Sequence, residues 1–77
     1  MSFDKYIERI KRIDKMIQLE ATGSPKALSI KIGISERMVY EYINKMKSLG
    51  APITYNESKS TYLYTEPVVF ECIFKKI

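Results

Sequence analysis

The sequence of 77 residues contains no histidine and no tryptophan, and it has a single cysteine, Cys72. One cysteine cannot form an internal disulfide, and without histidine the chain lacks the ordinary ligands of a metal cluster. It also lacks a glycine-rich phosphate loop and a pair of carboxylates that an apolar pocket would perturb, so the usual acid–base and nucleophilic arrangements cannot be assembled. We therefore expect no enzyme, no metal site and no cofactor.

Long apolar runs are also absent, so no segment is expected to cross a bilayer, and the first twenty residues are too charged for a secretion signal. The composition, 45% hydrophobic and 29% charged, is typical of a globular domain. At this length about 60% of the surface of the unfolded chain is buried on folding, which leaves room for one small core. We expect a single cytoplasmic domain, because a lone cysteine suits a reducing compartment.

The net charge of +4 is concentrated in the middle of the chain. Residues 21–50 carry five basic and two acidic side chains, whereas residues 1–20 carry five and four and residues 51–77 carry three and three. Clustered lysine and arginine attract the phosphate backbone of nucleic acids through counterion release. The middle segment is therefore the candidate for contact with a polyanion, and the alternative is a basic face that is merely solvated.

An amphipathic helix is predicted over about residues 4–20, because Ile7, Ile10, Ile13 and Ile17 recur at spacings of three and four with charged residues between them. We expect Gly23 to end this helix by supplying a left-handed residue.

A helix-turn-helix follows over residues 24–50. Ser24-Pro25 is a start signal for a helix that reaches about residue 32, because serine caps free amides and proline at the first position loses no hydrogen bond. After a tight turn at Gly33, Ser35 caps a third helix that runs to about residue 49 and stops at Gly50. Two helices joined by so short a turn are typical of a helix-turn-helix.

From Ile53 the pattern changes to a period of two. Ile53 and Tyr55, and then Tyr62 and Tyr64, alternate with polar residues on either side of a polar five-residue loop at 56–60. This predicts a β-hairpin over about 53–65, which we call the wing. The predicted fold is α+β, a winged helix-turn-helix of three helices followed by a two-stranded wing, over residues 1–66.

The apolar positions of these elements are expected to form one core. They are Ile7, Ile10, Ile13, Ile17, Leu28, Ile32, Ile34, Val39, Ile43, Met46, Leu49, Ile53, Tyr55, Tyr62 and Tyr64.

The C-terminal segment, residues 67–77, is apolar and β-prone, and Val68–Phe74 is apolar on nearly both sides of a strand. An exposed edge of that composition has to be covered. Two interpretations stay open. Val68–Phe74 mediates a homodimer, or it packs back on the first helix of its own chain, against Phe3 and Tyr6. Cys72 is expected to be a buried thiol.

Three motifs resemble one family. They are Ser35-Glu36-Arg37-x-Val39-Tyr40, Leu49-Gly50-Ala51-Pro52-Ile53-x-Tyr55 and Tyr62-x-Tyr64-Thr65-Glu66-Pro67. Together they resemble the N-terminal winged-helix domain of biotin-repressor-like and WYL-domain bacterial transcription regulators, over roughly three quarters of the chain, from about residue 10 to 67. The resemblance implies that the helix at about 35–49 reads the major groove of double-stranded DNA, that the wing lies along the backbone, and that the protein regulates transcription.

Helical geometry selects the candidate reading residues. With Val39 pointing inward, Arg37, Glu41 and Asn44 point outward at 100° per residue, flanked by Tyr40 and Lys45. Arginine can pair bidentately with guanine, asparagine with adenine, and glutamate can accept from cytosine. The spacing of Arg37 and Glu41 also allows a simple i,i+4 ion pair on a solvated face, which is the alternative.

Lysines are the candidate phosphate contacts, which position a protein on DNA without specifying the sequence. They are Lys26, Lys31, Lys45 and Lys47, together with Lys59 at the tip of the wing. The alternative function is a winged-helix module that binds another protein and no DNA, since fold does not fix function.

Overall fold

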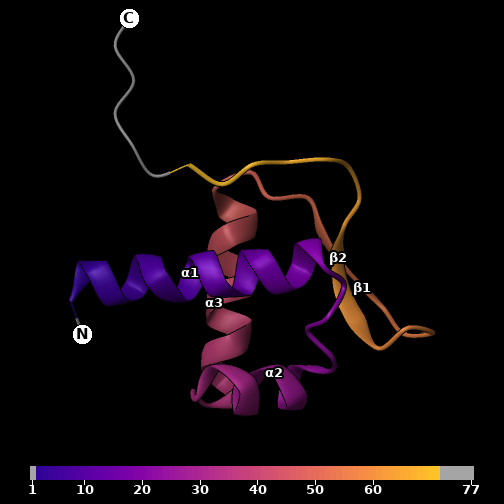
Figure 1. Ribbon diagram of the computed structural model, residues 1–77, viewed down its shortest axis with the longest axis horizontal. Coiled ribbons are helices and arrows are strands. Elements are labelled where there is room, and N and C mark those ends of the chain that lie inside the picture. The colour runs from indigo at the N-terminus through magenta and orange to yellow at the C-terminus, as the bar shows by residue number, and fades with distance from the viewer. Residues whose placement is uncertain (1, 72–77) are drawn as a thin grey trace, which may run out of the picture.

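The computed structural model describes residues 2–71. Its elements are α1 (Phe3–Gln18), α2 (Pro25–Ile32), α3 (Glu36–Ser48), β1 (Ile53–Asn56) and β2 (Thr61–Tyr64). Figure 1 shows α1 crossing α3, α2 at the beginning of α3, and the hairpin projecting to one side. The predicted α+β class, three helices followed by an antiparallel hairpin, is confirmed. None of the described helices combines the length and apolarity needed to cross a bilayer.

Serine side chains begin all three helices. The hydroxyls of Ser2, Ser24 and Ser35 accept hydrogen bonds from backbone N–H groups three residues later, at 3.2, 3.1 and 3.1 Å. These bonds satisfy amides that have no partner within a helix. Gly33 then ends α2 in the left-handed conformation, at φ 82°, which forms the tight turn between α2 and α3.

The end of α1 differs from the prediction. The helix ends at Gln18, and the left-handed residue that terminates it is Glu20, at φ 52°. Gly23 also has a positive φ, 71°, but it lies three residues further along the connection. The N–H groups of Glu20 and Ala21 donate to the carbonyls of Ile17 and Met16 at 3.0 and 2.9 Å, which is a Schellman termination. Glycine is the usual residue at that position because it has no Cβ. Here two backbone hydrogen bonds accompany a non-glycine residue at the same place.

The core lies where the three helices meet β1 and β2. Ten of the predicted core residues are buried: Ile10, Ile13, Ile17, Leu28, Ile32, Val39, Ile43, Met46, Ile53 and Tyr62. Ile7, Ile34, Tyr55 and Tyr64 are half-buried.

The predicted core is wrong at two positions, one at the C-cap of α3 and one within the helix. Leu49 is 62% exposed, because the helix has ended and its side chain lies at the rim of the core. Tyr42 is buried instead, with its ring 5.0 Å from that of Tyr6 and its hydroxyl accepting from Arg9 Nη1 at 3.4 Å. An aromatic body with a polar tip suits this position, since the ring packs between helices while the hydroxyl finds a donor.

The hairpin is in the register Ile53 opposite Tyr64 and Tyr55 opposite Tyr62. Its connection is one residue shorter than predicted, 57–60, because Asn56 pairs with Thr61. The rings of Tyr55 and Tyr62 meet edge to face at 5.0 Å. The tyrosines therefore pack with each other and with the helices, as the alternating pattern indicates.

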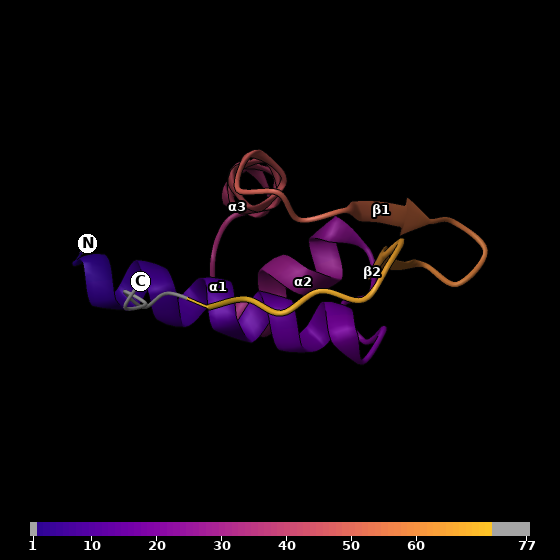
Figure 2. The same ribbon diagram turned by 90° about the horizontal axis from the view of Figure 1, so that it is seen from above.

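The described part of the C-terminal segment, residues 67–71, runs beside α1 (Figure 2). Gln18 Nε2 donates to the carbonyl of Val68 at 3.0 Å, and Phe70 packs against the core. Residues 67–71 form no strand, and Phe3 is 70% exposed, so the described residues do not cover it. Cys72–Phe74 lies outside the described residues, and the homodimer stays a prediction.

Candidate nucleic-acid interface

The candidate reading residues share the outer face of α3. Arg37, Tyr40, Glu41, Asn44 and Lys45 are all exposed, whereas the opposite face carries the core residues of the helix. Figure 2 looks along α3 and shows α1 and α2 below it, the hairpin beside it, and no helix or strand above it. The described part of the chain therefore leaves this face open to a partner.

Arg37 and Glu41 form the ion pair that their spacing allows. Arg37 Nε lies 3.5 Å from Glu41 Oε1, and the two side chains are 90% and 62% exposed. An exposed pair of this kind contributes about 0.3–0.5 kcal/mol, whereas a good bidentate contact to guanine contributes about 1–3 kcal/mol of discrimination. The pair is therefore weak enough for a base edge to displace.

The lysines divide into two groups. Lys26 in the first turn of α2, and Lys45 and Lys47 in the last turn of α3, are exposed, and their side chains make no hydrogen bond or ion pair within residues 2–71. The three ammonium groups are available to an anion. Lys45 and Lys47 also interact favourably with the C-terminal end of the α3 dipole, which is their purely structural role.

Lys31 and Lys59 have partners inside the chain. Lys31 Nζ donates to the carbonyls of Ala21 and Thr22 at 2.8 and 3.4 Å. Lys59 Nζ lies 3.3 Å from Glu20 Oε1. Both ammonium groups therefore hold the connection between α1 and α2, and a phosphate would have to compete with these contacts. Phosphate binding by either lysine stays a prediction.

A polar contact that no local sequence pattern indicates joins this connection to the hairpin. Thr22 and Thr61 are both buried, and their hydroxyl oxygens lie 3.0 Å apart. The alternation of the second strand predicts that Thr61 lies on the face opposite the tyrosines, away from the core, and Thr22 lies in a loop, where no burial is predicted. Their contact spans 39 residues of chain, so no local pattern could have indicated it.

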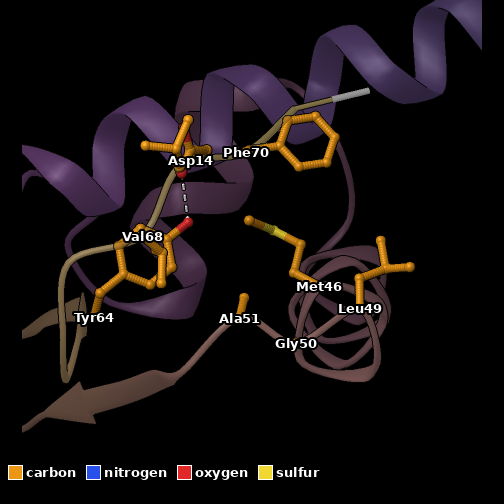
Figure 3. A pocket seen from close by; sticks show the side chains of 9 residues that line it. Asp14, Met46, Leu49, Gly50, Ala51, Tyr64, Val68 and Phe70 are labelled. Carbon is orange, nitrogen blue, oxygen red and sulfur yellow. Dashed lines mark hydrogen bonds between the residues drawn. The ribbon is translucent and has the colours of Figure 1, made fainter. Parts of the chain in front are cut away.

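A cavity of about 140 Å³ lies between α1, the end of α3 and the C-terminal segment (Figure 3). Its lining is apolar apart from one pair, in which the Tyr64 hydroxyl donates to Asp14 Oδ1 at 2.6 Å. Burial raises the pKa of Tyr64, and the hydrogen bond to the Asp14 carboxylate raises it further. The phenol therefore stays protonated and fastens β2 to α1. The cavity is smaller than the about 300–1,000 Å³ typical of small-molecule sites.

Comparison with protein-family models, curated proteins and solved structures finds no match for this chain. What the structure supports of the resemblance is the order of elements, three helices and then an antiparallel hairpin, which is a winged-helix-like topology.

Proposed function

We propose that this protein binds double-stranded DNA, with α3 in the major groove and the wing along the backbone. The observation that carries the proposal is the open outer face of α3, on which Arg37, Asn44 and Lys45 are exposed while the opposite face is anchored in the core. A helix exposed in this way and set in a basic helix-turn-helix can enter the major groove. Regulation of transcription is the role that such binding would serve.

The exposed residues have distinct proposed roles. Arg37 pairs with guanine O6 and N7, Asn44 with adenine, and Glu41 accepts from cytosine N4, while Tyr40 contacts the groove wall. Lys26, Lys45 and Lys47 contact phosphates, and Lys31 and Lys59 do so after exchanging their internal partners.

Salt dependence provides the first test. Binding of the intact chain to a labelled pool of random duplexes is measured by fluorescence anisotropy between 50 and 200 mM salt. Each phosphate contact contributes about −0.9 to the slope of log K against log salt, which is about 3.5-fold in affinity over that range. In the variant with Lys26, Lys45 and Lys47 changed to alanine, the slope should be shallower by about 2.7. Its affinity should therefore fall about 40-fold less than that of the parent chain over the same salt range.

The matched control removes three exposed lysines of α1, Lys5, Lys11 and Lys15. It changes the net charge equally and should keep most of the slope of the parent chain. An equal loss in both variants would indicate bulk charge alone, and a parent chain with no salt-dependent binding to any duplex would refute the proposal.

Sequence specificity requires a second experiment, selection of binding sites from random duplexes. With the selected site, Arg37→Ala should relax preference at one base pair, whereas Lys47→Ala should weaken all sequences alike. A uniform loss for both variants would contradict the role of Arg37.

The second candidate function, a protein-binding module, is favoured by exposed apolar residues beside the cavity. Leu49 and Val69 line the cavity and are 62% and 79% exposed. The partner we propose for this surface is a second copy of the chain, through Val68–Phe74. Sedimentation should then detect a dimer that Val69→Lys dissociates, and a parent chain that stays monomeric at high concentration would rule the dimer out.

A further inference from the structure

Two buried hydroxyls join the hairpin to the helices. Thr22 and Thr61 are 0% and 3% exposed. The N–H of Tyr62 donates to Thr22 Oγ1 at 2.8 Å, and the N–H of Thr22 donates to Thr61 Oγ1 at 3.3 Å. Two proton arrangements join the hydroxyls. Either Thr61 donates to Thr22 Oγ1 and Thr22 donates to the carbonyl of Gly23 at 3.0 Å, or Thr22 donates to Thr61 Oγ1 and Thr61 donates to the carbonyl of Tyr62 at 3.1 Å.

These bonds lie on the edge of β2 that faces away from β1, because Tyr62 N–H donates to Thr22 and not to the neighbouring strand. A two-stranded hairpin is marginally stable by itself and takes its position from what it packs against. Thr22 thus serves as a single-residue neighbour for the outer edge of β2. Figures 1 and 2 both show the α1–α2 connection beside this strand.

The same connection leads directly into the helix-turn-helix. Lys31 of α2 donates to the carbonyls of Ala21 and Thr22, and Lys59 of the wing loop pairs with Glu20. The connection is therefore bonded to the wing on one side and to α2 on the other. Hydrogen bonds in a buried cluster are directional, so the threonine hydroxyls fix the orientation of the hairpin relative to the connection. A valine in place of Thr22 has a similar volume and would fill the space without fixing this orientation.

We propose that the Thr22–Thr61 hydroxyl pair is the joint that sets the position of the wing relative to α3. This inference rests on the proposed DNA binding. The joint then determines whether the wing loop reaches the DNA backbone while α3 occupies the major groove. Both threonines are positioning residues, since neither is exposed to a ligand. The DNA contact that depends on them is that of Lys59 in the wing loop.

The position of the wing is measured first, in the intact chain without DNA. Nitroxide labels on Ser58→Cys in the wing loop and Asn44→Cys on α3, in a Cys72→Ser background, report the distance between the two elements by pulsed dipolar spectroscopy. The parent chain should give one narrow distribution. Thr22→Val should broaden or shift it, while Thr22→Ser, which keeps the hydroxyl, should leave it unchanged.

DNA binding is measured next, on chains with Asn44, Ser58 and Cys72 intact. Thr22→Val should reduce the salt slope by about 0.9, the share of one phosphate contact, and adding Lys59→Ala to it should cause no further loss. In the Thr22→Ser background Lys59→Ala should have its full effect. A purely structural role would lower the melting temperature without changing this dependence on Lys59.

The outcomes separate the two proposals. A parent chain without salt-dependent duplex binding refutes the proposed function and this inference together. A parent chain that binds, with a folded Thr22→Val variant that keeps the distance distribution or the salt slope, refutes the joint alone, as does a Thr22→Ser variant that behaves like Thr22→Val. Where circular dichroism shows that Thr22→Val is unfolded, Thr61→Val removes the other hydroxyl and is judged by the same measurements.

Discussion

Changing Ile43 to alanine tests which face of α3 is buried. Ile43 is 3% exposed and lies in the core beside Val39 and Met46. The change removes three carbons, worth about 2.4 kcal/mol at about 0.8 kcal/mol each, and the cavity left behind adds to this, so we expect a loss of about 2–5 kcal/mol. A domain of 77 residues has about 4–12 kcal/mol in total at about 0.05–0.15 kcal/mol per residue. The loss is therefore a large share of its stability.

The assay is thermal and urea unfolding followed by circular dichroism. A loss of this size should lower the melting temperature by roughly 10 °C or more in so small a domain. Leu49→Ala is the matched control, because Leu49 is 62% exposed and should change stability by less than about 1 kcal/mol. An Ile43→Ala variant that melts like the parent chain would refute the buried face of α3 and, with it, the assignment of the outer face as the reading surface.

Three further substitutions test particular contacts. Burial raises the pKa of Tyr64 above its ordinary value of 10.0, so the stability that the neutral phenol contributes is complete below pH 10 and is lost as the pH rises further. In urea unfolding from pH 8 to 11, the free energy of unfolding of Tyr64→Phe should therefore fall less at alkaline pH than that of the parent chain. An equal fall in both chains would contradict this. Gly23→Ala should lower the melting temperature more than Gly33→Ala, because both positions have positive φ but only at Gly23 would the new Cβ lie 2.9 Å from another side chain. Equal decreases in melting temperature would show that this close contact adds no cost. Lys31→Met should lower the melting temperature while Lys26→Met should not, since only Lys31 holds loop carbonyls; equal melting temperatures would show that those bonds add nothing.

The helix starts could be predicted from the sequence because their signals are local. Ser24-Pro25 and Ser35 precede helices whose hydrogen bonds close within three or four residues, and Gly50 supplies the left-handed residue after α3. The end of α1 could not be predicted in the same way. There the left-handed residue that terminates the helix is Glu20, although residue preference favours a glycine and Gly23 lies only three residues further on.

The candidate site shows the same division between local and distant interactions. The outer face of α3 follows from helical geometry, and the Arg37–Glu41 pair follows from a spacing of four. The partners of Lys31 and Lys59 do not, because each depends on how the α1–α2 connection folds beside the wing. Charge counts alone treat every lysine as equally available.

The distribution of available charge bears on how the protein would meet DNA. Lys26 lies in α2, which Figure 1 shows at the beginning of α3, and Lys45 and Lys47 lie in the last turn of α3, beyond the proposed reading positions Arg37 and Asn44. Phosphate contacts at both ends of a helix would fix its depth and register in the groove, which base contacts between them require. The engaged lysines hold the wing and the helix-turn-helix together instead. If the proposed DNA binding holds, the basic residues of the middle segment divide between positioning the protein on DNA and positioning its own elements, and the net charge measures neither role separately.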